Sequence, residues 1–255
     1  MERGGSEGLP QEAQAVILKL DPIPCTFTRR LNRFTVEIRL EGSTVRAHLT
    51  NTGRLHELLT PGRPCLATRI GGKKLRYRIL ALMHRGGYAL IDTLTQMKSL
   101  EEAIAKDLIP WLKGCRVARR NPRVGGSILD YELECSSTKR LVEVKSAVLE
   151  GPASESMYPD CPTDRGVRHV MELANRASQG EKPLIIMVAA FPGARCFKPY
   201  RQGDPRLYEE LAKAIRGGVE VRAIGIYMRP SGEVILYNPN LGLCPDFLKD
   251  VKSGA

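Results

Sequence analysis

The sequence predicts two domains, an all-β domain followed by an α/β domain. Short runs that alternate apolar with polar residues fill the chain from Phe27 to about Asp92, and helical patterns then alternate with strand patterns. With 255 residues and 42% hydrophobic content, the chain can bury a core in each domain. We therefore place the domains at residues 1–92 and 93–255.

The first domain has the strand pattern of a small closed barrel. Apolar residues alternate on both sides of a turn at Glu41-Gly-Ser43, and further strands are expected at 64–69, 75–83 and 88–92. Five or so short strands in this length fit an OB-like barrel, a fold that often binds nucleic-acid single strands or oligosaccharides.

Positive charge is concentrated in this barrel. The chain has 39 Lys and Arg against 28 Asp and Glu, and residues 21–90 alone carry 13 basic and 4 acidic side chains, a net charge of +9. Such a segment indicates a polyanionic partner, because neutralising phosphates releases their counterions. Charge and a low aromatic content disfavour an oligosaccharide, so we expect DNA. The residues expected to bind it are Arg29, Arg30, Arg33, Asn51, Lys73 and Lys74.

The second domain reads as three strands between helices, followed by alternating strands and helices. Ser99-Leu-Glu-Glu102 is a capping box that predicts a helix ending before Pro110. Further helices are expected from Thr163 or Asp164 to about Gln179 and from Pro205 to Gly217, and strands at 115–119, 128–134, 141–148, 183–191 and 219–228. The first ten and last five residues are expected to be disordered.

Asp130, Glu143 and Lys145 are the candidate catalytic residues. If the runs on either side of Ser136–Lys139 pair as a hairpin, a symmetric register puts Asp130 opposite Lys145 and diagonal to Glu143, at roughly 7 Å. Two carboxylates and an ammonium at this spacing can hold Mg²⁺ or Mn²⁺ and position a water to hydrolyse a phosphodiester. The same charges also fit the solvated face of an ordinary strand.

Cysteine and hydropathy patterns suggest a location. Seven cysteines never fall in a Cys-x-x-Cys, which favours reduced thiols in a cytoplasm, and the four histidines lack metal-site spacing. The longest apolar run, Leu184–Phe191, is too short to span a bilayer, and the N-terminus lacks the apolar segment of a signal peptide. No membrane partner is expected.

The order of these elements resembles the PD-(D/E)xK nuclease core. Leu129-Asp130 stands where that motif has Pro-Asp, and Glu143-Val-Lys145 matches its second half. Glu102, on the preceding helix, resembles a further metal-binding carboxylate of that superfamily.

Nearly the whole chain resembles the sugar fermentation stimulation protein family, SfsA. The resemblance rests on Arg29–Phe34, Asn51-Thr-Gly53, Glu101–Ile104, Asp130, Glu143-Val-Lys145, Tyr158-Pro-Asp160, Thr163–Gly166 and His169. It implies an N-terminal OB-like barrel, a C-terminal PD-(D/E)xK domain, DNA binding and a role in regulating sugar-utilisation genes. Thr50, Gln96-Met97 and Tyr158 depart from the family pattern, and none of them is among the three candidate catalytic residues.

Two functions remain open. In the first, Asp130, Glu143 and the Val144 carbonyl hold Mg²⁺ with Glu102, while Lys145 orients or deprotonates a water. Arg165 and His169, four residues apart at the start of a helix, then meet a phosphate. In the second, the protein is a non-catalytic DNA-binding regulator that keeps the nuclease-like domain as a scaffold. The strandedness of the DNA and the oligomeric state, including a homo-oligomer, are left open.

Overall fold

The computed structural model describes residues 14–136 and 138–254. The disorder expected of residues 1–10 lies outside these ranges. At the other end, helix α4 (Pro245–Ser253) includes residues 251–253, so the expected disorder of the C-terminus is wrong for those positions.

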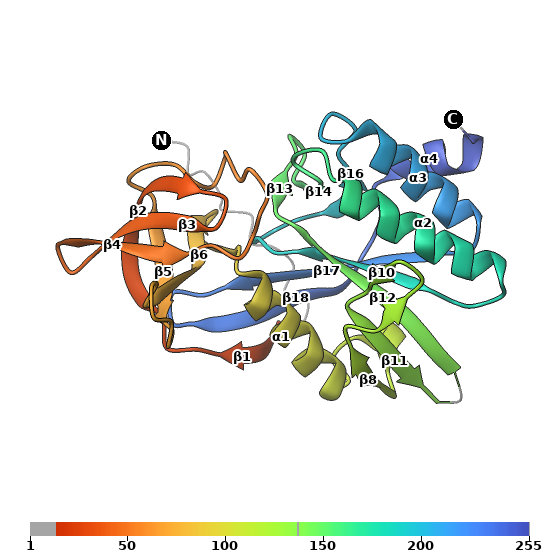
Figure 1. The fold of residues 1–255 in the computed structure, drawn as a ribbon, viewed down its shortest axis with the longest axis horizontal. Helices are drawn as coiled ribbons and strands as arrows, with labels where there is room; N and C mark the ends of the chain where they lie inside the picture. The colour runs from red at the N-terminus through yellow and green to blue at the C-terminus, as the bar shows by residue number, and fades with distance from the viewer. Residues whose placement is uncertain (1–13, 137, 255) are drawn as a thin grey trace, which may run out of the picture.

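Five strands form the closed N-terminal barrel, at the left of Figure 1. They are β2 (Ile23–Asn32), β3 (Thr35–Leu40), β4 (Ser43–His48), β5 (Pro64–Arg69) and β6 (Tyr77–His84). Neighbouring strands pair antiparallel in the order β4-β3-β2-β5-β6, and a parallel β4–β6 pairing closes the barrel. The alternating apolar residues face inward, because Phe27, Val36 and Ile38 are fully buried.

A mixed sheet forms the core of the second domain. Its strands in order are β8 (Cys115–Arg120), β11 (Tyr131–Cys135), β12 (Thr138–Ala147), β15 (Leu184–Ala189), β17 (Glu220–Met228), β18 (Glu233–Leu241) and β1 (Ala15–Lys19). The central strands β12, β15 and β17 are parallel, and the outer strands are antiparallel. Every residue of β15 is buried, as expected for a central parallel strand covered on both faces.

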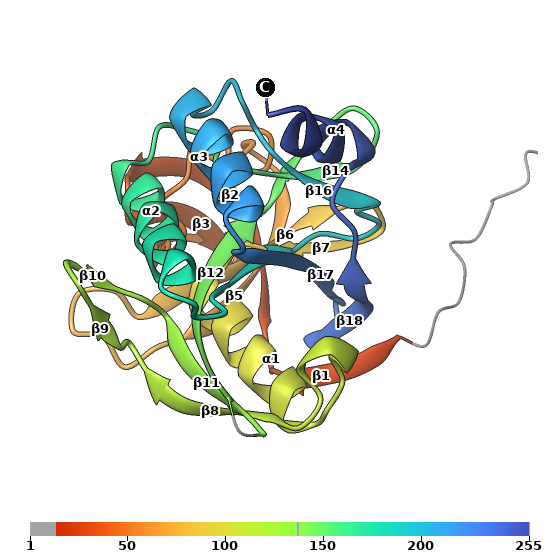
Figure 2. The ribbon, with the colours of Figure 1, turned by 90° about the vertical axis from the view of Figure 1, so that its right-hand side faces the viewer.

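Helices cover both faces of this sheet. Figure 2 shows α1 (Thr93–Ala105) on one face, and α2 (Asp164–Ser178) and α3 (Pro205–Arg216) on the other. Helix α4 packs against α3. The remaining short elements are β7 (Gly87–Leu90), η1 (Pro110–Leu112), β9 (Arg123–Val124), β10 (Ser127–Ile128), β13 (Leu149–Glu150), β14 (Glu155–Tyr158) and β16 (Cys196–Pro199).

The two domains share strands across the expected boundary. The barrel sequence ends where α1 begins, but β1 pairs with β18 and therefore completes the C-terminal sheet. Tyr88 of β7 also pairs with Met228 of β17. Residues 1–92 are thus not a self-contained unit, because Ala15–Lys19 belongs structurally to the second domain.

The expected start of the first helix is wrong. Helix α1 begins at Thr93, and the Asp92 side chain caps it by accepting a hydrogen bond from the Thr95 backbone N–H at 3.1 Å. Ser99 is a buried residue in the second turn. The interpretation failed because Asp92 was assigned to the preceding strand, although Asp is as good an N-cap as Ser. Strand β18 and helix α4 were not predicted.

The expectation of reduced thiols is also wrong for four cysteines. Cys115 pairs with Cys135, its cross-strand neighbour on β8 and β11, and Cys196 on β16 pairs with Cys244 at the start of α4. Sequence spacing could not show either pair, because each depends on which strands lie side by side. Disulfides occur in exported proteins and also in intracellular proteins of hyperthermophiles, so the cytoplasmic location stays a prediction without its original support.

We expect the Cys196–Cys244 bond to stabilise the protein substantially. It closes a loop with a sequence separation of 48, for which the chain-entropy relation gives about 4 kcal/mol. Replacing both cysteines with Ser should lower the free energy of unfolding by this order in urea titrations. Cys161→Ser, which removes a free thiol, is the control. Equal stability of the double variant and the control would contradict the prediction.

Candidate active site

Asp130 lies at a break in the predicted strand. The expected run 128–134 is divided into β10 and β11, and Leu129-Asp130 forms the break between them. The backbone N–H of Asp130 donates to the Val142 carbonyl at 3.2 Å, and its carboxylate accepts from the Val144 N–H at 2.7 Å. The side chain is therefore fixed against the middle of β12.

The hairpin register differs from the predicted one by two residues. Tyr131 pairs with Val142 and Cys135 with Thr138, so the loop has only two residues, and Asp130 lies level with Glu143. Ser136 has φ of 55°, the left-handed conformation typical of two-residue hairpin loops. Because the shift is even, the predicted faces are kept, and Asp130 lies across from Glu143 rather than diagonal to it.

Glu143 is the centre of a buried cluster. Only 2% of its side chain is exposed, and its Oε1 lies 2.5 Å from Lys145 Nζ and 2.5 Å from His169 Nδ1. Burial opposes ionisation of Glu143, but the charges and hydrogen bonds of Lys145 and His169 outweigh it and lower the pKa of this carboxyl group. Burial also opposes the charge on Lys145, yet Glu143 and Tyr158 raise its pKa. The pair is a carboxylate and an ammonium ion.

The surroundings of Asp130 raise its pKa, whereas those of Glu143 lower the pKa of Glu143. Burial, together with the negative charge of Glu143, raises the pKa of Asp130 to about 6. The hydrogen bond from Val144 and the charge of Lys145 oppose this rise without cancelling it. Two carboxyl groups with pKa values displaced in opposite directions are typical of a functional site.

The two carboxylates fit a divalent cation. Glu143 Oε2 is buried and has no hydrogen-bond partner in the described residues, whereas Oε1 is fully used. Buried carboxylate oxygens are costly when unpaired, and a hard cation such as Mg²⁺ or Mn²⁺ is a suitable partner. Mg²⁺ binds through one or two protein carboxylates and keeps several waters, so Asp130 and Glu143 suffice as protein ligands.

Glu102 does not join this pair. Its side chain is 41% exposed and its nearest charged neighbour is Lys106, at 3.7 Å. Across residues 14–136 and 138–254, no three His, Cys, Asp or Glu side chains gather in a metal-binding cluster. The carboxylate of α1 that reaches the sheet is Glu101, which accepts hydrogen bonds from the Tyr131 hydroxyl and the Arg120 guanidinium.

The expected DNA-binding residues of the barrel divide into two groups. Arg29, Lys73 and Lys74 are exposed, and Arg29 forms an ion pair with Glu37. Arg33 is also exposed, with its guanidinium over the Phe34 ring. All four side chains are on the surface, where phosphates can reach them.

Arg30 and Asn51 instead hold the loop between the domains. Arg30 donates to the carbonyls of Gly53 and Arg54, at 2.6 and 3.0 Å. Asn51 Nδ2 donates to Ser146 Oγ on β12 at 3.2 Å, and its Oδ1 accepts from the Gly53 N–H. Arg30 thus fixes the barrel loop at Gly53 and Arg54, and Asn51 attaches that loop to the strand that carries Lys145.

Arg165 and His169 have different surroundings. Arg165 is exposed, and its Nε lies 3.4 Å from His169 Nε2. His169 is only 4% exposed and contacts Glu143, so it positions a carboxylate rather than reaching a phosphate.

A polar contact that sequence reasoning missed connects α1 to the site. Gln96 is buried in α1 and donates from Nε2 to Ser146 Oγ at 2.9 Å and to the Leu90 carbonyl at 2.6 Å. The sequence did contain a signal for this contact, because Gln96 lies on the buried face of the helix. A buried amide needs hydrogen-bond partners, so a polar contact at this position could have been expected.

Comparison with known proteins identifies the family. Residues 94–232 match the family described as "Sugar fermentation stimulation protein RE domain", and residues 28–91 match the "SfsA N-terminal OB domain". The chain belongs to the SfsA family. The predicted fold class, an OB-like barrel followed by a nuclease-like α/β domain, is confirmed.

Several relatives match over nearly their whole length. A sugar fermentation stimulation protein homolog from Pyrococcus furiosus is 46% identical over 228 residues, which cover 89% of this chain and 98% of the relative. The homolog from Archaeoglobus fulgidus is 43% identical over 222 residues, with 86% and 94% covered. The solved structure of Pyrococcus furiosus SfsA in complex with Ca²⁺ has a TM-score of 0.87 and 44% identity, and covers 90% of this chain and 99% of that chain. Among the described helices of the present chain, none is long and apolar enough to cross a membrane.

The raised pKa of Asp130 predicts a specific pH dependence of stability. The folded state holds this proton more tightly than the unfolded chain, whose aspartate has the ordinary pKa of 3.8. The resulting stability is fully present below about pH 4 and is lost as pH rises through about 6, which corresponds to about 3 kcal/mol. Urea titrations in EDTA should give the free energy of unfolding of wild type and of Asp130→Asn at each pH. The difference between the two proteins should fall by about 3 kcal/mol as pH rises from 4 through 6. A difference independent of pH would show that the environment of Asp130 is not as described.

Proposed function

We propose that this protein is a divalent-metal-dependent phosphodiesterase that acts on DNA. The observation that carries the proposal is the buried Glu143 carboxylate, whose Oε2 is left unpaired, next to the half-buried Asp130 and Lys145. A strand that only needed solubility would expose these charges rather than bury them. The Ca²⁺ complex of the Pyrococcus furiosus relative supports a divalent-cation site in the family.

Asp130 and Glu143 would hold the cation. A bound Mg²⁺ or Mn²⁺ supplies positive charge against the phosphate oxygens and makes a hydroxide available near neutral pH. For the protein itself, a cation would offset the burial and the negative charge of Glu143, which together raise the pKa of Asp130.

Lys145 would orient the attacking water rather than deprotonate it. Its pKa is raised by the neighbouring Glu143 and Tyr158, so the ammonium keeps its protons and acts as a hydrogen-bond donor and a positive charge. It is only 11% exposed, which holds it in one place. His169 would keep Glu143 in position through the 2.5 Å contact with Oε1.

The basic barrel would supply DNA affinity. Arg29, Arg33, Lys73 and Lys74 lie on its surface and can contact phosphates of any sequence. This arrangement separates binding from chemistry, because none of these four belongs to the Asp130–Glu143–Lys145 cluster.

Metal binding at Asp130 should stabilise the fold. At a free Mn²⁺ concentration 100-fold above its dissociation constant, the gain is about 2.7 kcal/mol, or a melting temperature higher by about 5–10 °C. Differential scanning calorimetry should show this rise for wild type and none for Asp130→Asn. Glu102→Gln, which changes a carboxylate outside the pair, should respond like wild type. Equal shifts for wild type and Asp130→Asn would exclude a site built on Asp130.

Cleavage tests the chemistry directly. Wild type with Mn²⁺ should degrade or nick labelled DNA, and EDTA should abolish the activity. Lys145→Ala should lose at least about 100-fold in rate while keeping DNA affinity, since it removes one positive charge among many. Lys145→Arg should also fail, because the planar guanidinium does not replace a compact ammonium.

A non-catalytic regulator is the other outcome of this experiment. Tight DNA binding and Mn²⁺ binding at Asp130, with every DNA and RNA substrate left intact, would leave a regulator that uses the nuclease-like domain as a scaffold.

A further inference from the structure

Three adjoining cavities of about 210, 240 and 860 Å³ lie between the barrel and the C-terminal domain, and together they form the interdomain cleft. The first and second share Leu55 and Asp160 in their walls, and the second and third share Glu57 and Tyr200. Residues of the barrel face residues of the nuclease-like domain along its whole length.

The narrow end of the cleft lies beside the catalytic strand. Ser146 and Tyr158 line the smallest cavity, and Lys145 Nζ lies over the Tyr158 ring, 6.0 Å from its centroid. Arg33, already expected to bind DNA, lines the same cavity. A ligand in the cleft would therefore end next to the candidate active site.

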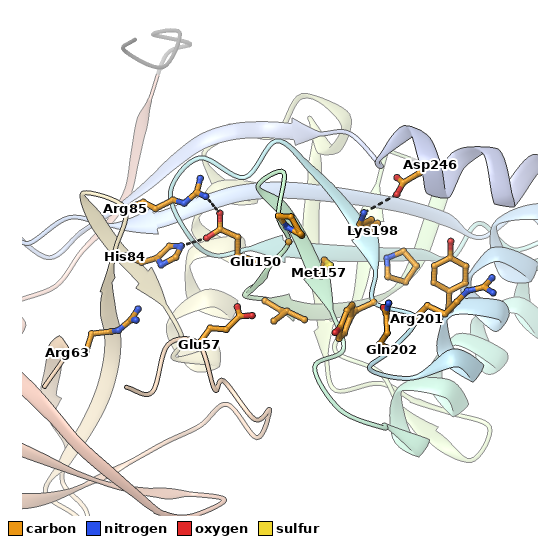
Figure 3. A pocket seen from close by; sticks show the side chains of 16 residues that line it. Glu57, Arg63, His84, Arg85, Glu150, Met157, Lys198, Arg201, Gln202 and Asp246 are labelled. Atoms are coloured by element: carbon orange, nitrogen blue, oxygen red, sulfur yellow. Dashed lines mark hydrogen bonds and ion pairs between the residues drawn. The ribbon is translucent and has the colours of Figure 1, made fainter. Parts of the chain in front are cut away.

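The wide end is lined by charged side chains from both domains, and its basic members face Glu57, Glu150 and Asp246 in the same lining. Figure 3 shows Arg63, His84 and Arg85 on the barrel side, and Lys198 and Arg201 on the other. Arg85 and Lys198 are neutralised by Glu150, Glu155 and Asp246. Within the described residues, the arginines of the cleft that have no carboxylate partner are Arg33, Arg54, Arg63 and Arg201.

A tyrosine ring accompanies these arginines. Tyr200 is half-buried where the second and third cavities meet. The neighbouring Tyr208 is buried, and the guanidinium of Arg201 lies 4.3 Å from the centroid of its ring, so Tyr200 rather than Tyr208 offers a ring for stacking. Unpaired guanidinium groups that track a backbone, next to rings on which bases stack, are what proteins use to bind single-stranded nucleic acid.

The size of the cleft favours one strand over two. The largest of the three cavities, at about 860 Å³, is the size of a pocket that encloses one drug-sized molecule. This volume has room for a few nucleotides of one strand. In a duplex the bases are already stacked inside, so they cannot reach Tyr200 between two domain walls.

We propose that the interdomain cleft binds single-stranded DNA and leads it to Lys145. The direction of the strand toward Lys145 rests on the proposed function, whereas its binding in the cleft can be measured without cleavage. The barrel surface then supplies general affinity, and the cleft selects strandedness.

Fluorescence anisotropy in EDTA tests the proposal, with a labelled 20-nucleotide single strand and the matching duplex as probes. Wild type should bind the single strand more tightly. Tyr200→Ala should weaken single-strand binding by about 5- to 100-fold, the measured range for losing one stacked base, and change duplex binding little. Tyr200→Phe, which keeps the ring, should restore most of the affinity that Tyr200→Ala loses.

Arginine variants give an independent measure if Tyr200→Ala fails to fold. Arg201→Ala should weaken binding of the single strand alone, whereas Arg119→Ala, an exposed arginine on the edge strand β8, should not. Arg29→Ala on the barrel surface should weaken binding of both probes equally.

Two results would overturn the cleft proposal. One is a duplex affinity equal to or above that of the single strand. The other is that Tyr200→Ala and Arg201→Ala both bind the single strand and the duplex as tightly as wild type. Tyr200-dependent binding without any cleavage would instead overturn only the proposed chemistry, and cleavage without a Tyr200 effect would overturn only the cleft.

Discussion

The buried carboxylate of Asp92 joins the two halves of the molecule. It is fully buried, and Oδ1 accepts a hydrogen bond from Thr50 Oγ1 of the barrel at 2.8 Å. Arg78 Nε of β6 lies 3.1 Å from the same oxygen, so the two side chains form an ion pair. The angle of this contact does not fit a hydrogen bond. Oδ2 caps α1 through Thr95. Burying a charge is tolerable only with such partners, so the barrel and the helix must meet in one geometry.

That geometry extends to β12, the strand that carries Glu143 and Lys145. Helix α1 holds Ser146 through Gln96, and the barrel loop holds it through Asn51. Ser146 follows Lys145 directly, so contacts from both domains fix the backbone next to Lys145. Asn51 and Ser146 also line the smallest of the three cavities, so the same contact joins its two walls.

Local patterns predicted much of this structure. Helix α2 begins at Asp164 and α3 at Pro205, where Thr163 and Asp204 act as caps. The period-2 runs predicted the pairing of β11 with β12, which places Asp130, just before β11, next to the strand of Glu143 and Lys145. What failed depended on distant contacts. The two-residue hairpin, the disulfides and the exposed Glu102 follow from which elements pack together, and Asp92 could have ended a strand or begun a helix.

The pairing of β1 with β18 has a consequence for how the chain folds. Ala15 and Leu236 are direct neighbours in the sheet although more than 200 residues separate them. During synthesis β1 emerges first and remains without its partner until almost the whole chain has been made. Such non-local pairing slows folding, since loop closure precedes any gain from the contact. The edge of the C-terminal sheet is therefore completed late, and the barrel has to form while its own N-terminal extension is still unpaired.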